Sequence, residues 1–358
     1  MTVGRVRTVL GDVDPATLGR TMTHEHLLIG FGRWRREAGI LAGSAPPALP
    51  ELAGPLTWEN SGLARRRGHP DNSALDDVDL AVSEALRFMR AGGGAIVDAT
   101  NPDLTRNPHA LRAIAERTGL HVVMGCGHYV HGHHPLDMDA RTVDALVAEI
   151  VEDVTRGADG TEIRAGVIGE IGSEYPMVPN EVRALGAAAR ASRITGAALL
   201  IHPGRDPRAP LETVRVVVEA GGATERTIVG HLDRTLFDPA DMLALARTGC
   251  YLEWDLFGDE SSYYALAPID MPNDATRIDH LRRLIAEGFG ERLLVAQDIC
   301  RKTSLCRYGG LGYAHILENV VPIMRRKGMS EDEIEAILVR NPARVLALAA
   351  PAPDPAAR

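Results

Sequence analysis

The sequence has few cysteines and few aromatic residues, and it contains no long hydrophobic run. Its 358 residues include four cysteines, too few and too scattered for a disulfide framework, and 4% aromatic residues. No stretch approaches the roughly 20 uninterrupted apolar residues that a membrane helix needs. The first twenty residues also lack the apolar run of a secretory signal. These absences exclude a disulfide-stapled domain and a membrane span, and we expect a cytoplasmic protein.

Charge of one sign is not concentrated anywhere in the chain. Lys and Arg total 39 against 48 Asp and Glu, which gives a formal net charge of −9. The sequence therefore lacks the basic footprint of a nucleic-acid-binding protein. With 45% hydrophobic residues, its composition is that of a globular protein with a sizeable core. We expect a small-molecule substrate, with no nucleic-acid and no membrane partner.

Short β-branched runs alternate along the chain with longer segments of helical periodicity. The eight predicted strands span residues 21–29, 95–100, 121–126, 165–171, 197–202, 227–231, 250–255 and 292–298. The amphipathic segments between them include 77–89, 107–117, 143–155, 181–194, 211–219, 239–247 and 278–287. Repeated βα units of this kind indicate a parallel sheet. Eight of them are the number in a (β/α)8 TIM barrel, so we predict a single α/β barrel over residues 1–350.

Three regions depart from the βα rhythm. Residues 1–20 contain turn-forming residues between apolar flanks and are predicted to form a short β-hairpin. Residues 30–76, rich in Pro, Gly and Arg, form a long insertion after the first strand, which either covers one end of the barrel or is a loop without a role. Residues 351–358 are rich in Pro and Ala and are predicted to fray.

Histidine, with 13 residues, is the residue type that points toward chemistry. His24 and His26 lie in the first predicted strand, and a spacing of two places both imidazoles on one side while Glu25 points to the other. Four more residues stand at the carboxyl ends of predicted strands, where TIM-barrel enzymes carry their active sites. These four are Glu170, His202, His231 and Asp298.

Imidazole and carboxylate groups together suit zinc and its neighbours. Taken singly, a strand-end histidine or acid is more often structural, but six at the mouth of one barrel favour a metal site. Six groups exceed what one tetrahedral ion uses. We therefore predict two divalent metal ions per chain, zinc first and manganese or cobalt as alternatives, with a shared carboxylate.

A denser histidine cluster, His128, His131, His133 and His134, lies in the loop after the third predicted strand. A loop implies no ligand-fixing geometry, so substrate contact or solvent exposure is the interpretation for this cluster. Tyr129 in the same loop is the better candidate for substrate binding, because its phenol can hydrogen-bond a carbonyl or hydroxyl group.

Five motifs, in this order, resemble the metal motifs of phosphotriesterase-related proteins of the amidohydrolase superfamily. They are Thr23-His24-Glu25-His26, Gly169-Glu170-Ile171-Gly172, Ile201-His202-Pro203-Gly204, Gly230-His231-Leu232-Asp233 and Ala296-Gln297-Asp298. Residues 253–258 and 302–317 are similar to the branch that includes the animal phosphotriesterase-related proteins and the resiniferatoxin-binding proteins. The resemblance covers nearly the whole chain.

The resemblance implies a role for each residue. His24, His26 and Asp298 would hold a buried metal, and His202 and His231 a more exposed one. Glu170 would bridge the two metals where the bacterial phosphotriesterases and quorum-quenching lactonases have a carboxylated lysine, a difference that weakens the transfer of phosphotriesterase activity. Members of this family are often dimers, so we expect a homodimer.

The expected mechanism is attack of a metal-bridging hydroxide on a carbonyl or phosphoryl centre, with Asp298 as the catalytic residue that takes up the proton. Basic residues in the last loops predict an anionic group on the substrate, although they could equally be solvated or salt-bridged. The residues predicted to bind substrate are Tyr129, Arg205, Phe257, Arg301, Lys302 and Tyr308.

These features predict a metal-dependent hydrolase of a carboxylic ester or lactone that bears an anionic group. Three alternatives remain open. They are phosphotriester hydrolysis, amide hydrolysis of an N-acyl amino acid or N-acyl aminosulfonate, and ligand binding without catalysis.

Overall fold

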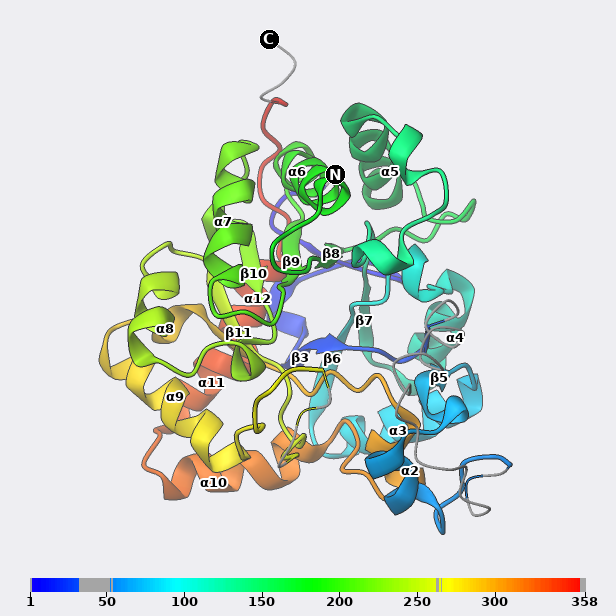
Figure 1. The fold of residues 1–358 in the computed structure, drawn as a ribbon, viewed down its shortest axis with the longest axis vertical. Helices are drawn as coiled ribbons and strands as arrows, with labels where there is room; N and C mark the ends of the chain where they lie inside the picture. Colours follow the sequence, from blue (N-terminus) through cyan, green and yellow to red (C-terminus); the bar gives the residue numbers. More distant parts are fainter. Residues whose placement is uncertain (1, 32–51, 53, 262–263, 265, 355–358) are drawn as a thin grey trace.

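The computed structural model describes residues 2–31, 52, 54–261, 264 and 266–354. Eight parallel strands lie at its centre with helices around them (Figure 1). The strands are β3 (Arg20–Glu25), β6 (Gly93–Asp98), β7 (His121–Met124), β8 (Val167–Gly172), β9 (Ala198–His202), β10 (Thr227–Val229), β11 (Tyr251–Trp254) and β12 (Leu293–Val295). Each lies within or overlaps a predicted strand, and most are shorter than predicted.

The strands form two parallel arcs that join into one barrel. One arc has the order β3-β6-β7 and the other β8-β9-β10-β11-β12. At the first seam, Gly169 N donates to Cys126 O at 2.7 Å and Gly166 N to Met124 O at 2.9 Å. At the second seam, Asp298 N donates to His24 O at 3.1 Å. The predicted (β/α)8 TIM barrel is confirmed.

Among the described residues, seven helices connect successive strands, and five of them begin at a side chain that caps the first turn. Asp77 accepts from Leu80 N, and Asn107 accepts from Ala110 N. These helices are α3 (Val78–Arg90), α4 (Pro108–Thr118), α5 (Val143–Thr155), α6 (Pro179–Thr195), α7 (Ala209–Glu219), α8 (Pro239–Ala246) and α9 (Asp274–Ala286). After β12 the chain forms α10 (Val321–Arg326), α11 (Glu331–Glu335) and α12 (Asn341–Leu346), with π-helical turns at Ile316–Val320 and Ala336–Arg340.

Alternation along the strands separates two apolar layers. In β6, Ala95 and Val97 belong to one buried cluster, while Ile96 belongs to the larger cluster that includes residues of the surrounding helices. The first cluster also contains Val6 from the amino-terminal segment and Leu346 from α12. The barrel is therefore packed solid at the end opposite to the carboxyl ends of its strands, as expected of this fold.

The predicted amino-terminal hairpin is present as β1 (Val6–Thr8) and β2 (Gly11–Val13), paired antiparallel. The carboxyl-terminal segment differs from the prediction that residues 351–358 fray. Asp354 forms an ion pair with Arg190 of α6 at 2.6 Å, and Ala352 N donates to Arg193 O at 2.9 Å. Residues 351–354 are held by these contacts, and residues 355–358 lie outside the described residues.

Part of the predicted insertion is described, and it is fastened to the loop after β12. Its ends pair as β4 (Ile29–Gly30) and β5 (Ala74–Leu75), and it contains α2 (Ser61–Arg67). Arg65 Nη2 donates to Thr303 O at 2.8 Å, and Thr303 N donates to Asn72 Oδ1 at 2.9 Å. This part of the insertion therefore lies against a loop at the carboxyl end of the barrel. Residues 32–51 and 53 lie outside the described residues.

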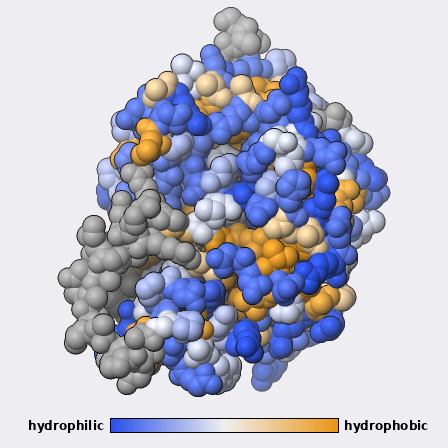
Figure 2. Space-filling model, turned by 90° about the vertical axis from the view of Figure 1, so that its right-hand side faces the viewer, coloured by the Kyte–Doolittle hydropathy of each residue, from blue (hydrophilic) through white to orange (hydrophobic). Residues whose placement is uncertain are grey.

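The face shown in Figure 2 is mostly hydrophilic, with hydrophobic residues gathered in small patches. Among the residues that the structure describes, no helix has the length and apolar character needed to cross a membrane.

Candidate metal centre

The six residues predicted to bind metal come together at the carboxyl ends of the strands. His24 lies near the end of β3 and His26 just beyond it, while Glu170 and His202 lie in β8 and β9. His231 follows β10 and Asp298 follows β12. Five of the six are buried, and Asp298 is partly exposed. The centre is therefore shielded from solvent except on the side of Asp298.

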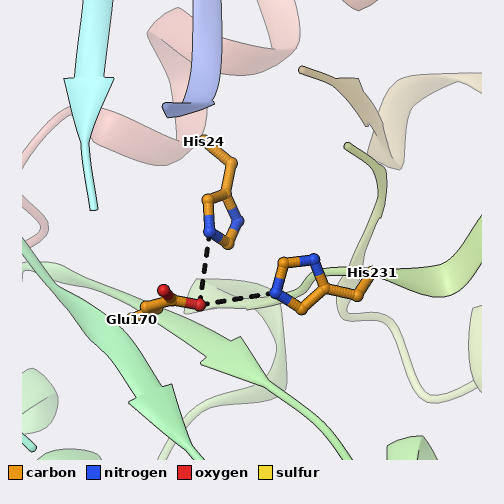
Figure 3. Close-up of side chains that lie close together, drawn as sticks. All are labelled: His24, Glu170 and His231. Carbon is orange, nitrogen blue, oxygen red and sulfur yellow. Dashed lines mark hydrogen bonds and ion pairs between the residues drawn. The ribbon is translucent and has the colours of Figure 1, made fainter. Parts of the chain in front are cut away.

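Glu170 touches all four histidines. Its Oε2 atom lies 2.8 Å from His202 Nδ1, 3.3 Å from His24 Nε2 and 3.4 Å from His231 Nε2. Its Oε1 atom lies 3.4 Å from His26 Nε2. Figure 3 shows His24 and His231 converging on this carboxylate. Glu170 thus occupies the position between two histidine pairs that a bridging carboxylate requires.

Asp298 completes the half of the centre that contains His24 and His26. Its Oδ1 atom lies 3.1 Å from His26 Nε2. One potential ligand atom from each of these three residues falls within 4.8 Å of the others, and the same holds for His24, Glu170 and His231. His24 thus belongs to both groups.

A second layer of polar groups holds the histidine nitrogens that face away from Glu170. Asp255 contacts two of them, with Oδ2 at 3.0 Å from His24 Nδ1 and Oδ1 at 2.9 Å from His231 Nδ1. Glu253 Oε2 lies 3.3 Å from His24 Nδ1, and Thr100 Oγ1 lies 2.8 Å from His26 Nδ1. Such contacts set the tautomer and orientation of a metal-binding imidazole.

Two of the six residues adopt a left-handed backbone that is uncommon outside glycine. The φ angle is 55° at His231 and 46° at Asp298. The Asp255 carboxylate accepts from His231 N at 2.8 Å, and His24 O accepts from Asp298 N at 3.1 Å. Such conformations cost about 1–3 kcal/mol each and cluster at functional sites. Surrounding hydrogen bonds hold both residues in orientations that ordinary strand geometry would not provide.

The electrostatics of the centre favour a cation. Burial opposes the charged form of His26, but Asp298 and Glu170 outweigh it and raise its pKa to about 10. Burial likewise opposes ionisation of Glu170, yet the neighbouring imidazoles, His202 first, hold its pKa well below the ordinary value. For His202, burial and the charge of His231 lower the pKa well below normal. The centre therefore combines an ionised carboxylate with neutral and proton-attracting imidazoles.

The residues fit a divalent metal. The Nε2 atom of His24 is buried and makes no hydrogen bond among the described residues, although it lies 3.3 Å from Glu170 Oε2. A buried polar atom without a hydrogen bond is rare and requires an explanation such as a missing ion. Imidazole nitrogen and carboxylate oxygen are the donor set of catalytic zinc sites. The geometry thus supports a metal centre that uses the histidines and carboxylates predicted from the sequence.

Tyr129 and Arg205 lie beside this centre. The hydroxyl of Tyr129 is 3.4 Å from His202 Nδ1. Burial, together with the charge of Glu170, raises the pKa of Tyr129 well above its ordinary value, so its phenol remains a hydrogen-bond donor. Arg205 is half-buried, and its Nε donates to Tyr264 Oη at 3.4 Å.

The other four residues predicted to bind substrate are placed differently. Phe257 is buried in the hydrophobic core, with the Arg277 guanidinium 5.7 Å from its ring centroid. Lys302 forms an ion pair with Asp71 at 2.5 Å, so its charge fastens the insertion to the barrel. Arg301 is exposed, and Tyr308 is partly buried and packs against the core.

The histidine cluster of the β7 loop positions Tyr129. His134 Nε2 lies 2.7 Å from Tyr129 O, and Asp103 Oδ2 accepts from Tyr129 N at 2.9 Å. His128 Nδ1 lies 3.3 Å from the same Asp103 oxygen, and the His133 ring packs edge-on against the Tyr129 ring. These histidines therefore support a residue at the centre, a role that the sequence did not predict.

Sequence reasoning also missed Asp255, Tyr264 and Arg234. Asp255 stood at the end of a predicted strand, so the same positional signal that selected Asp298 could have found it. Arg234 lies three residues after His231, and its Nη2 donates to His202 Nε2 at 3.1 Å. Tyr264 carries no local signal, because only the fold brings it to Arg205.

Comparison with known proteins gives one matching family model and three similar proteins. A model of the phosphotriesterase family matches residues 4–346. N-acetyltaurine hydrolase of Homo sapiens is 41% identical over 345 residues, which cover 95% of this chain and 97% of that protein. A resiniferatoxin-binding protein from Rhodobacter sphaeroides is 34% identical with a TM-score of 0.89, covering 96% of this chain and 95% of that one. A lactonase from Listeria monocytogenes is 26% identical with a TM-score of 0.79, covering 97% and 100%.

Replacing Asp255 by Asn is expected to weaken metal retention by about 10- to 100-fold, because two histidines lose the anionic partner that orients them. Metal content after dialysis against buffers of graded free zinc measures the effect. Asp279→Asn, at an exposed carboxylate that pairs with Lys327, is the matched control. Retention equal to that of the unmodified protein would show that Asp255 does not support the centre.

Proposed function

Since this chain belongs to the phosphotriesterase family, we propose that it is a metal-dependent amidase of small N-acyl compounds that carry an anionic group. The observation that carries the proposal is the 41% identity to human N-acetyltaurine hydrolase over nearly the full length of both chains. This amide reaction was one of the alternatives from the sequence. It now precedes ester or lactone hydrolysis as the first proposal.

The substrate of that relative combines the two features that the site can address. N-acetyltaurine has an amide carbonyl at one end and a sulfonate anion at the other. The metal centre can act on the carbonyl group. Arg234 supplies a cationic group that contacts His202, and Arg205 supplies a second one that contacts Tyr264. We therefore propose N-acetyltaurine, or a close N-acyl relative of it, as the substrate.

His24, His26 and Asp298 would hold one metal ion and His202 and His231 a second, with Glu170 shared between them. When bound, divalent ions of this kind polarise a carbonyl group and lower the pKa of a water molecule toward neutrality. Glu170 supports this assignment because one carboxylate contacts all four histidines. Asp255 and Glu253 hold His24 from behind, so that its Nε2 atom stays directed at Glu170.

Asp298 is the proposed acid–base group. It lies on the open side of the centre, and its left-handed backbone directs the carboxylate toward His26. An amide nitrogen leaves poorly as an anion, so a group must take the proton from the attacking water and deliver it to that nitrogen. Tyr129, which stays protonated, can donate a hydrogen bond to the substrate carbonyl on the side of His202.

Lactone or ester hydrolysis is the second candidate. It is favoured by the similarity to the lactonase from Listeria monocytogenes over the whole of that chain. Esters and amides share the carbonyl centre and the tetrahedral intermediate, and they differ in the basicity of the leaving group. The need to protonate that group, and hence the dependence on Asp298, is greater for the amide.

Purified protein loaded with zinc or manganese is expected to hydrolyse N-acetyltaurine faster than an uncharged acetamide, a lactone, a carboxylic ester or an aryl dialkyl phosphate. The reason is that only the first substrate offers both the acyl group and the anion. Initial rates at substrate concentrations well below KM give kcat/KM for each substrate and rank them. The product measured is the free amine for the amides, the acid for the lactone and the ester, and the phenol for the phosphate. Preferred turnover of lactones or phosphotriesters would overturn the amidase proposal, and binding without any turnover would favour a ligand-binding protein.

Asp298→Asn is expected to lower kcat for the amide substrate by about 100-fold or more, because the side-chain carboxamide of asparagine is too weak a base to accept the proton from water. Steady-state kinetics, with metal content measured on the same sample, test this. Asp144→Asn, whose side chain is 82% exposed on the outer helix α5, serves as the control. A near-normal kcat in metal-replete Asp298→Asn would remove Asp298 from the mechanism.

Elemental analysis is expected to give about two metal ions per chain, and Glu170→Ala about one or fewer, since the shared carboxylate is lost. Glu219→Ala, at an exposed glutamate that pairs with Arg215, should bind as much metal as the unmodified protein. A single metal per chain, together with an active Glu170→Ala variant, would refute the shared centre.

A further inference from the structure

Arg234 is an unusual buried cation. Its side chain is 2% exposed, and its guanidinium donates to His202 Nε2 at 3.1 Å, to Pro203 O at 3.1 Å and to Thr235 Oγ1 at 3.3 Å. Among the described residues, no carboxylate oxygen lies within 4.0 Å of it. A buried charge without a counter-ion is costly, and proteins normally pair it.

The other buried arginines of this protein follow that rule. Arg277 pairs with Asp233 at 2.8 Å and with Asp274 at 2.9 Å. Arg7 and Arg106 pair in the same way, with Asp12 and with Asp153 and Asp159, respectively. In the part of the chain that the structure describes, Arg234 is therefore the exception among its buried arginines.

Arg205 is a second cation of the same kind. It is half-buried, its Nε donates to Tyr264 Oη at 3.4 Å, and its guanidinium carbon lies 5.8 Å from the centroid of the Tyr264 ring. No carboxylate of the described residues comes within 4.0 Å of Arg205 either. By contrast Arg208, three residues further along, forms two hydrogen bonds with Asp206 at 2.8 Å each.

Both cations lie at the loop that follows β9. Arg234 Nη2 donates to Pro203 O at 3.1 Å, and Pro203 is two residues before Arg205 in the chain. Two guanidinium groups that repel each other in a partly dry site are stabilised when an anion lies between them. Asp255 does not neutralise Arg234, because its carboxylate already contacts His24 and His231.

We propose that Arg234, Arg205 and the Tyr264 hydroxyl form the subsite that binds the anionic group of the substrate. This inference deepens the proposed function and rests on it for the identity of the substrate. The ligand class is a compact oxyanion on a short linker, since only one imidazole ring, that of His202, separates Arg234 from Glu170. Two guanidinium groups and one phenol can serve the three oxygens of a sulfonate, which favours a sulfonate over a carboxylate.

Lys302 and Arg208 are not part of this subsite, because each already has an ion-pair partner within the chain. Both are cationic and lie in loops that follow barrel strands, but Asp71 and Asp206 already neutralise them. A cation binds an external anion most strongly where the chain provides no internal one. This difference separates Arg205 and Arg234 from Lys302 and Arg208.

Calorimetric titration with ethanesulfonate tests the subsite without any turnover. The metal-loaded protein is expected to bind ethanesulfonate more tightly than propionate, and Arg234→Met and Arg205→Met to weaken ethanesulfonate binding by about 10-fold or more each. Arg234→Lys is expected to recover part of the loss. Arg208→Met, which removes a neutralised arginine from the neighbouring surface, is expected to bind as the unmodified protein does.

Metal content is measured on every variant, because Arg234 touches His202. If Arg234→Met fails to fold or loses metal, the half-buried Arg205→Met decides, and unchanged ethanesulfonate binding in metal-replete Arg205→Met would overturn the proposal. Tighter binding of propionate would assign the subsite to a carboxylate and overturn the sulfonate preference. Sulfonate binding that depends on both arginines in a protein that cleaves neither N-acetyltaurine nor other N-acyl compounds with an anionic group would refute the proposed function while supporting the subsite.

Discussion

The contact of Glu170 with four imidazoles is the interaction on which the rest of the centre depends. His24 and His26 come from the first strand of the barrel and its end, and His202 and His231 come from the segments of β9 and β10. They reach one carboxylate only because the barrel closes between β7 and β8 and between β12 and β3. The solid apolar packing at the opposite end makes that closure rigid. The metal centre and the hydrophobic core are thus two consequences of one closed sheet.

Much of this arrangement could be predicted because it follows from periodicity. Short apolar runs between segments of helical periodicity located the eight strands, and the ends of those strands located four of the six proposed ligands directly. The spacing of His24 and His26 predicted that Glu25 would face away, and Glu25 indeed accepts hydrogen bonds from Gln297 N and Ile299 N. The ends of strands are local features, and the parallel order of the strands follows from the βα repeat. Both can therefore be predicted from a single sequence.

What could not be predicted depends on which charges meet in three dimensions. Lys302 and Arg205 look alike in the sequence, as basic residues after barrel strands, but Asp71 from the distant insertion neutralises only Lys302. The histidine-rich loop looked more like a metal site than His231 did, yet His134 and Asp103 hold the backbone of Tyr129. Phe257 was placed in a loop by its position, but its side chain turns into the core. Pairing and side-chain direction are tertiary properties that no local pattern records.

A count of formal charges connects the metal centre with the proposed anion subsite. Four carboxylates, those of Glu170, Glu253, Asp255 and Asp298, surround the four histidines. Two divalent ions, as proposed, would offset these four negative charges. Arg205 and Arg234 would then remain as net positive charge beside the centre, whereas the whole chain is negative by 9. An anionic substrate therefore meets a local field opposite in sign to that of the protein as a whole, and its charge completes the pairing that the chain leaves open at Arg234.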